Sequence, residues 1–356
     1  MKVAIIGSGP AGMFTAEFLA KDPATQVDIY ERRLVPFGLL RYGVAPDHVG
    51  TKAIGRQFER TLTRPNVALA CGVEVGTDLA LADLLARYDH LVLASGSGPA
   101  RLLPLDLPQV QEWTGLDLLR WMNGDPEVSM QPGAGIRRVL VIGHGNVSLD
   151  VVRLLAQAGP AAPTAAVAAI AEPAARWLHS LALEEIQVVG RGAAAHTRFS
   201  AQGLMELQDL ERFVPMTEAA EVAETEGAGN ADALAVLRSW AGQVRKDLRR
   251  PIRFGFGRSG MLGGGFVPDL VVHCVGQQVA RIAGWEPMAW IGSLQASDHA
   301  RVHAVGWAAG ERAGAIPASR IQAKAAADGI RAKGLTQGPA DAPSGAGPQR
   351  SSAAQV

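Results

Sequence analysis

The sequence predicts an α/β fold built from two Rossmann-like dinucleotide-binding domains. Two short apolar runs, at residues 3–6 and 139–142, each end in closely spaced glycines and lead into a helical pattern. Another apolar run follows each helical pattern, at residues 27–30 and 187–190. Strand, glycine-rich turn, helix and strand in this order form the βαβ unit of a dinucleotide-binding domain, and the unit occurs here twice.

The length and composition favour two domains and a tail. The chain has 356 residues, 48% of them apolar, which is typical of a globular α/β protein. We expect a first domain from residues 1–104 and 300–333, and a second from residues 105–299. Residues 334–356 contain almost no large apolar side chain, so we predict a disordered tail. The formal net charge of zero argues against a strongly basic nucleic-acid binder.

The two cysteines, Cys71 and Cys274, lie far apart, and no Cys-X-X-Cys pair exists. This argues against a redox disulfide and against a cysteine-ligated iron–sulfur or zinc site, so no metal is expected. No signal-peptide pattern and no apolar run of membrane-spanning length is evident, which favours a cytoplasmic protein without membrane association.

The first glycine motif reads GSGPAG at residues 7–12, directly after a predicted strand. Its first glycine allows a tight turn, its second lets the backbone approach a pyrophosphate, and its third lets helix and strand pack closely. Glu31 ends the next strand, where a carboxylate can accept hydrogen bonds from an adenosine ribose. The motif alone does not separate FAD from NAD. The expected cofactor contacts are Gly7, Gly9, Pro10, Ala11, Gly12, Glu31 and Arg32.

Residues 35–48, VPFGLLRYGVAPDH, closely resemble the segment after the second strand in adrenodoxin reductase and the related bacterial ferredoxin–NADP reductases. The resemblance runs from Val3 to about Ala326, with a shortened middle. It implies an FAD domain that carries an inserted NAD(P) domain, with this segment wrapped around the FAD. The contacts that it implies are Gly38, Leu39 and Val44, with Ser95 and Gly96 at a second strand end.

A C-terminal segment also resembles the family. Gly306 and Trp307, followed by Gly314, Ala315 and Ile316, match the family's C-terminal flavin segment. The resemblance implies that Trp307 lies near the flavin ring and that backbone N–H groups at a helix start face its N1–O2 edge. Such N–H groups would stabilise negative charge on a reduced flavin.

The second glycine motif reads GHGNVSLD at residues 143–150 and resembles the family loop that holds the pyrophosphate of NADPH. The contacts implied are Gly143, Gly145, Asn146 and Val147, with Arg191 after the next strand. In the family the residue matched by Asp150 lies close to the one matched by His48. A His–carboxylate pair beside a flavin could relay a proton, so we expect His48, Asp150 and Trp307 to be the catalytic residues.

The nicotinamide half departs from the family pattern. The family carries two arginines after this strand, which bind the 2′-phosphate of NADPH, whereas here Arg191 is followed by Gly192. Gly203 replaces a glutamate, and Glu311 stands where relatives have other residues. Losing a bidentate guanidinium weakens selection for NADP over NAD, so NADPH and NADH both remain candidates.

Five basic residues stand within residues 245–253 of this neutral chain: Arg245, Lys246, Arg249, Arg250 and Arg253. In the family a basic stretch at a comparable place docks an acidic ferredoxin, and opposite charges raise the association rate. A solvated helix face is the other interpretation. Pro251 would end any helix here, so we expect the cluster at the surface.

Three functions are compatible with these residues. The first is an FAD-dependent NAD(P)H:ferredoxin-type reductase, which passes hydride from the nicotinamide to FAD and single electrons to an iron–sulfur protein. The second is a flavin oxidase or dehydrogenase that uses the altered nicotinamide pocket for a small metabolite. The third is a flavin-binding subunit without catalysis.

Overall fold

The computed structural model describes residues 1–105, 107, 109–129, 131–159, 169–223, 229–242, 249–257, 265–282, 284–310 and 316–334. These residues form two compact units. The first contains residues 1–44, 50–99 and those from 277 onward; the second contains Ala45–Val49 and Ala100–Gly276. The sequence placed the two borders after residues 104 and 299, whereas the structure places them after Pro99 and Gly276.

The first unit is organised around a parallel sheet of five strands. Their order across the sheet is β13 (Val302–Ala304), β4 (His90–Leu93), β1 (Lys2–Ile6), β2 (Gln26–Glu31) and β3 (Val67–Cys71). Strand β1 is central and its last four residues are buried, as expected for a parallel strand covered on both faces. The chain moves from β1 to β2 on one side and places β4 on the other, so the strand order reverses at β1, where such sheets bind dinucleotides.

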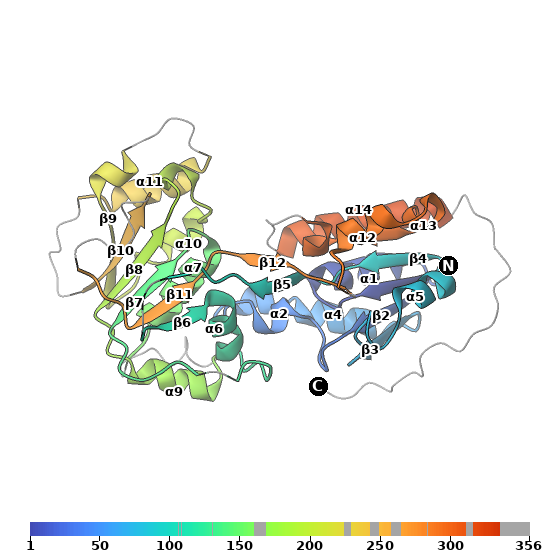
Figure 1. The fold of residues 1–356 in the computed structure, drawn as a ribbon, viewed down its shortest axis with the longest axis horizontal. Coiled ribbons are helices and arrows are strands. Elements are labelled where there is room, and N and C mark those ends of the chain that lie inside the picture. Colours follow the sequence, from blue (N-terminus) through green and yellow to red (C-terminus); the bar gives the residue numbers. More distant parts are fainter. Residues whose placement is uncertain are drawn as a thin grey trace. The chain divides into compact units, whose positions relative to one another are not determined.

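Helices cover this sheet. They are α1 (Pro10–Leu19), α2 (Leu39–Tyr42), α3 (Val49–Lys52), α4 (Gly55–Leu62), α5 (Leu81–Arg87), α12 (Pro287–Ser293), α13 (Ala296–His299) and α14 (Ile316–Gly334), with the 3-10 helix η4 (Gly306–Ala309). Helix α14 packs along α1 (Figure 1). Phe14 of α1 meets the ring of Phe58 edge-on at 5.0 Å, which joins α4 to the same core.

The second unit contains a parallel sheet of six strands. Their order is β6 (Gln111–Thr114), β11 (Leu270–His273), β7 (Arg138–Ile142), β8 (Glu185–Gly190), β10 (Arg250–Phe256) and β9 (Phe213–Thr217). Its helices are α6 (Gly115–Met122), α7 (Asn146–Ala156), α9 (Glu172–Ser180), α10 (Ala201–Met205) and α11 (Ala231–Ser239), with the 3-10 helices η1 (Ala194–His196) and η2 (Ala219–Val222). A separate two-stranded sheet pairs β5 (Ser97–Ala100) with β12 (Gln277–Val279).

The interpretation of residues 245–253 as a helix face ended by Pro251 is wrong for the part that the structure describes. Residues 250–253 begin β10, which lies between β8 and β9, and Pro251 itself is buried. Pairing with β8 begins only at Ile252, so the proline stands at the end of that ladder, where a missing N–H is tolerated. Arg253 binds Glu185 at 3.0 Å. Arg245 and Lys246 lie outside the described residues.

Among the described residues, no helix is both long enough and apolar enough to cross a membrane. Residues 335–356 of the predicted tail lie outside the described part of the chain, and Gly334 closes α14.

Candidate functional site

The first glycine loop is held by close backbone packing. Gly7 has a φ of +104°, and a Cβ at this position would lie 2.3 Å from the carbonyl oxygen of Ala94. A Cβ at Gly12 would lie 2.0 Å from the carbonyl oxygen of Gly7. These two glycines therefore let α1 approach β1 and β4, whatever the loop binds.

Gly9 is different, because it faces open space. A Cβ at Gly9 would meet no atom of the described protein within 4 Å. Gly9 caps α1 without a side-chain hydrogen bond, Pro10 follows it, and the first turn carries no acidic residue. The first backbone N–H groups of a helix have no partner within the helix, and the helix dipole makes this end positive. The loop is thus suited to hold a pyrophosphate.

Glu31 closes this loop from the end of β2. Its side chain is buried, and Oε2 accepts hydrogen bonds from Ser8 N at 3.0 Å and from Ser8 Oγ at 2.5 Å. The neighbouring Arg32 is exposed. The carboxylate predicted to bind a ribose therefore also fixes the conformation of the glycine loop.

The segment matched to the reductase family lies against the same loop. Phe37 has a φ of +83°, unusual for a residue other than glycine, and its N–H donates to Ser8 Oγ at 3.2 Å. A Cβ at Gly38 would lie 3.4 Å from Gly9 Cα. Leu39 begins α2, and Val44 N donates to Leu39 O at 2.8 Å. The segment is thus folded back onto the start of α1.

The remaining predicted contacts in this unit come from β4 and the C-terminal segment. Gly96 has a φ of +74° and open space where a Cβ would stand. Ser95 Oγ is buried and has no hydrogen-bond partner in the described part of the chain. A Cβ at Gly306 would lie 2.8 Å from Ala11 Cβ, so the C-terminal segment also reaches the start of α1. Trp307 follows in η4 and is half-buried.

These observations fit a flavin dinucleotide in the first unit. The open backbone at Gly9 and Gly96 leaves room for a ligand, and the unsatisfied hydroxyl of Ser95 calls for a polar partner. Gly314, Ala315 and Glu311 lie outside the described residues, and Ile316 is the first residue of α14.

The second glycine loop repeats this construction. Gly143 has a φ of +134°, and a Cβ there would lie 2.3 Å from Cys274 O, whereas a Cβ at Gly145 would meet no atom within 4 Å. Gly145 caps α7, again without an acidic residue in the first turn. Asn146 Oδ1 accepts a hydrogen bond from Ser200 N at 2.7 Å, and Val147 is 39% exposed. This loop therefore offers a second opening for a phosphate.

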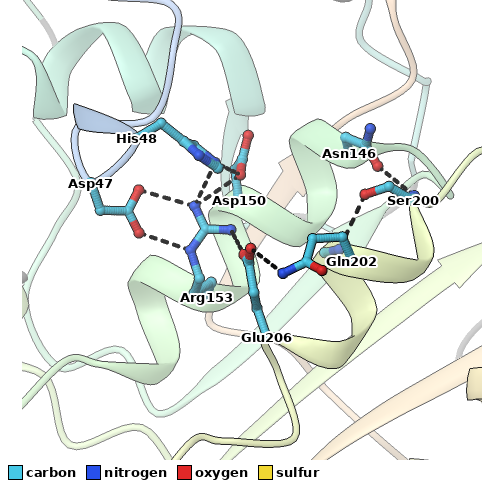
Figure 2. Close-up of polar contacts among 9 residues, drawn as sticks. Asp47, His48, Asn146, Asp150, Arg153, Ser200, Gln202 and Glu206 are labelled. Atoms are coloured by element: carbon cyan, nitrogen blue, oxygen red, sulfur yellow. Dashed lines mark hydrogen bonds and ion pairs between the residues drawn. The ribbon is translucent and has the colours of Figure 1, made fainter. Parts of the chain in front are cut away.

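A cluster of charged side chains surrounds Arg153 of α7 (Figure 2). Arg153 is buried and donates to both carboxylate oxygens of Asp47, from Nε at 2.8 Å and from Nη2 at 2.9 Å. Its Nη2 also lies 2.9 Å from Asp150 Oδ1, and its Nη1 lies 3.2 Å from Glu206 Oε2. His48 Nε2 contacts Asp150 Oδ1 at 2.7 Å. One guanidinium thus organises three carboxylates and one imidazole.

The cluster favours a positive charge on His48. Its pKa is raised above the ordinary value, chiefly by the hydrogen bond to Asp150, and burial only partly opposes this. The pKa of Arg153 is raised as well, because its bonds to Asp47 and its attraction to Asp150 outweigh the effect of burial. His48 Nε2 also lies 2.9 Å from Arg153 Nη2, and it can accept from that group only while it carries no proton.

The structure brings two of the three predicted catalytic residues together. His48 and Asp150 are both in the second unit, since Ala45–Val49 belongs to it, while Trp307 is in the first. Arg153 and Asp47 were not assigned from the sequence. The available signal was the spacing of Asp150 and Arg153, which places both on one face of α7.

Neither cysteine forms a disulfide. Burial raises the pKa of the Cys71 thiol to about 11. Cys274 lies beside the second glycine loop, and burial raises its pKa as well.

Two parallel sheets, each with open backbone where a glycine loop meets a helix, define a protein of the two-dinucleotide-binding-domain class. Residues 1–189 match the family described as pyridine nucleotide-disulphide oxidoreductase. The chain belongs to this family.

Three proteins similar to this chain are named as reductases or oxidoreductases. Cindoxin reductase of Citrobacter braakii is 41% identical over 214 residues, which cover 60% of this chain and 46% of that protein. NADPH:adrenodoxin oxidoreductase of Homo sapiens is 39% identical over 158 residues, which cover 43% of this chain and 32% of that protein. The structure of FprA, an oxidoreductase of Mycobacterium tuberculosis, matches with a TM-score of 0.79 and 27% identity, over 94% of this chain and 84% of that one.

The match thus spans about half the length, or less, of these two curated relatives. The predicted fold class and the resemblance to adrenodoxin reductase and ferredoxin–NADP reductases are confirmed.

Proposed function

We propose that this chain is an NAD(P)H:ferredoxin-type reductase that binds FAD in its first unit and a pyridine nucleotide in its second. The observation that carries the proposal is the repeated glycine loop, since Gly9 and Gly145 both leave open backbone at the start of a helix whose N-cap residue has no side chain. Relatives named as ferredoxin–NADP reductases and adrenodoxin reductases support it, as does a similar solved structure of FprA in complex with NADPH.

The bound FAD supplies the capacity to take a hydride from a nicotinamide and to release electrons one at a time. The chain supplies placement and charge. Gly9, Ser95 and Gly96 hold the flavin dinucleotide, with Glu31 keeping the first loop in shape. Gly145 and Asn146 hold the pyridine nucleotide.

His48 and Asp150 hold a proton between Nε2 and Oδ1, ready for exchange during turnover. Arg153 and Asp47 act as positioning residues for this pair, because the same guanidinium binds Asp47 and Asp150. Trp307, half-buried in η4, would lie near the flavin ring.

An iron–sulfur protein is the proposed acceptor, in line with the names of the relatives. An acidic ferredoxin that docks on residues 245–253 is a narrower proposal. Among the described cations of this segment, Arg253 is exposed and forms an ion pair with Glu185. It would therefore attract an acidic partner less strongly than an unpaired arginine would. A cytoplasmic location stays a prediction.

The test is anaerobic stopped-flow mixing of the purified flavoprotein with NADPH or NADH, followed by absorbance of the oxidised flavin. Rapid bleaching by either nucleotide supports the reductase, and reoxidation by an added acidic [2Fe–2S] ferredoxin supports the acceptor. A flavin that neither nucleotide reduces would overturn the proposal and would favour a metabolite oxidase or dehydrogenase.

A further inference from the structure

The third position of the second glycine loop carries a serine. The first loop has Gly12 at this position, where a Cβ would lie 2.0 Å from Gly7 O. The second loop has Ser148 there, the third residue of α7, whereas such loops ordinarily carry glycine or alanine at this position. Ser148 is fully buried, so its hydroxyl group needs hydrogen-bond partners inside the protein.

The hydroxyl group of Ser148 contacts three backbone atoms of the loop. Its Oγ lies 2.7 Å from Gly143 O and 2.7 Å from Gly145 O, and it accepts a hydrogen bond from Gly145 N at 3.2 Å. A hydroxyl carries one proton, so it donates to one of the two carbonyl oxygens at a time. Gly145 O already accepts from Ser148 N at 3.0 Å, whereas Gly143 is buried and its carbonyl oxygen receives no other hydrogen bond from the described residues. We therefore assign the proton to the bond with Gly143 O.

The first turn of α7 is looser than that of α1. In α1 the first helical hydrogen bond, from Met13 N to Gly9 O, is 2.9 Å long. The matching bond in α7, from Leu149 N to Gly145 O, is 3.4 Å long, because the backbone N–H of Ser148 shares the same carbonyl oxygen. The first unit joins helix and loop by direct packing at the third glycine, whereas the second unit joins them through a side-chain hydrogen bond.

These bonds determine which groups of the loop are left for a ligand. The N–H of Gly145 is directed inward to Ser148 Oγ, and the side chain of Asn146 is held by Ser200 N (Figure 2). The backbone N–H groups of Asn146 and Val147, the first two residues of α7, have no partner within the helix, and both residues are exposed. A loop that holds such donors in one arrangement before binding loses less entropy when a pyrophosphate arrives.

We propose that Ser148 is a positioning residue for the pyridine nucleotide: its hydroxyl group fixes the second glycine loop so that the N–H groups of Asn146 and Val147 receive the pyrophosphate. This inference rests on the proposed function of the second unit. Ser148 is buried and acts through the backbone of the loop, by its bonds to Gly143 and Gly145. Because the pyrophosphate is common to NADPH and NADH, Ser148 contributes equally to the binding of both.

Calorimetric titration of the intact oxidised flavoprotein with NADP⁺ and with NAD⁺ tests the proposal. Ser148→Ala is expected to weaken each nucleotide that the wild type binds by the same factor, about fivefold, as for one lost buried hydrogen bond. In stopped-flow mixing with the reduced nucleotide, the rate of flavin bleaching at saturation should stay within about twofold of the wild type, because only the hold on the pyrophosphate changes. The matched control is Thr217→Val, which removes a buried hydroxyl group of β9 that donates to Leu237 O at 2.9 Å. It should lower thermal stability and leave the nucleotide affinity unchanged.

An unchanged nucleotide affinity in Ser148→Ala, with a loss of thermal stability like that of Thr217→Val, would overturn the proposal and leave Ser148 a structural residue. A loss confined to one of two bound nucleotides would also overturn it, because both carry the same pyrophosphate. The wild type separates these results from the proposed function. A wild type that binds neither nucleotide overturns the function of the second unit and the role of Ser148 with it. A wild type that binds a nucleotide but keeps its flavin oxidised sinks the reductase alone, and the titration still decides the role of Ser148.

Discussion

The imidazole Nε2 of His48 lies 2.7 Å from Oδ1 of Asp150, although the two residues are 102 positions apart in the sequence. His48 stands on a five-residue segment that belongs to the second unit, while the chain on either side of it belongs to the first. Asp47 and His48, neighbours in sequence, bind Arg153 and Asp150, which are neighbours on one face of α7. The pair is therefore held in a group of four side chains, in which Arg153 and Asp47 position His48 and Asp150.

The first prediction concerns the protonation of His48. We expect its pKa to lie above the ordinary value of 6.5 in the wild type and to fall in Asp150→Asn, because the hydrogen bond to Asp150 is the main cause of the shift. NMR titration of the imidazole measures it, with His48→Gln providing the assignment. A wild-type His48 that titrates below 6.5 would contradict the cluster as described.

The raised pKa of His48 makes the unfolding free energy depend on pH. A folded-state pKa above the unfolded value stabilises the fold below about pH 6.5, and this contribution is lost as the pH rises through the folded pKa. The difference in unfolding free energy between wild type and Asp150→Asn should therefore shrink above about pH 6.5. Since 36% of the His48 side chain is exposed, solvent screening keeps the change small.

The second prediction concerns Arg153, whose side chain is 8% exposed. Arg153→Ala leaves Asp47, Asp150 and Glu206 without their common cation, and we expect a loss of about 3 kcal/mol in unfolding free energy. Urea unfolding followed by tryptophan fluorescence measures it, because Trp113, Trp121, Trp177 and Trp240 are all in the second unit.

Two variants control this measurement. Arg153→Lys keeps the charge and should recover part of the loss, though it cannot bind Asp47 through two nitrogens. Arg137→Ala removes an exposed arginine paired with Glu184 and should cost less than about 1 kcal/mol. Equal effects of Arg153→Ala and Arg137→Ala would show that the cluster does not stabilise the unit.

The glycine loops and the strands next to them could be predicted from the sequence, because apolar runs ending in glycine are local patterns. The charged cluster could not, since Asp47 and Arg153 meet only after folding and each alone resembles a surface charge. β10 was missed because its proline and two arginines argue locally against a strand, whereas the sheet places Ile252, Phe254 and Phe256 in the core. Tertiary burial outweighs local propensity there.

The third prediction separates the two glycines of the second loop. Gly145→Ala places a methyl group in open space and should weaken a pyridine nucleotide while FAD content and thermal stability stay near wild type. Gly143→Ala brings a Cβ against Cys274 O at a positive φ, so we expect it to destabilise the unit. Thermal unfolding and nucleotide titration of both variants measure this, and equal stability of the two would be inconsistent with the described loop.

The fourth prediction applies the same reasoning to the first loop, for which FAD is the proposed ligand. Gly9 has a φ of −67° and a ψ of 178°, which alanine also adopts, and its Cβ would touch no described atom. Gly9→Ala should therefore fold as the wild type does but lose FAD during purification, because the methyl group occupies the approach of the pyrophosphate. Gly12→Ala should destabilise the protein itself, since its Cβ would lie 2.0 Å from Gly7 O. The ratio of flavin to protein absorbance, measured beside circular dichroism, distinguishes the two effects. A folded Gly9→Ala protein that retains a full complement of FAD would mean that the pyrophosphate does not pass Gly9, and the first opening would then need another ligand.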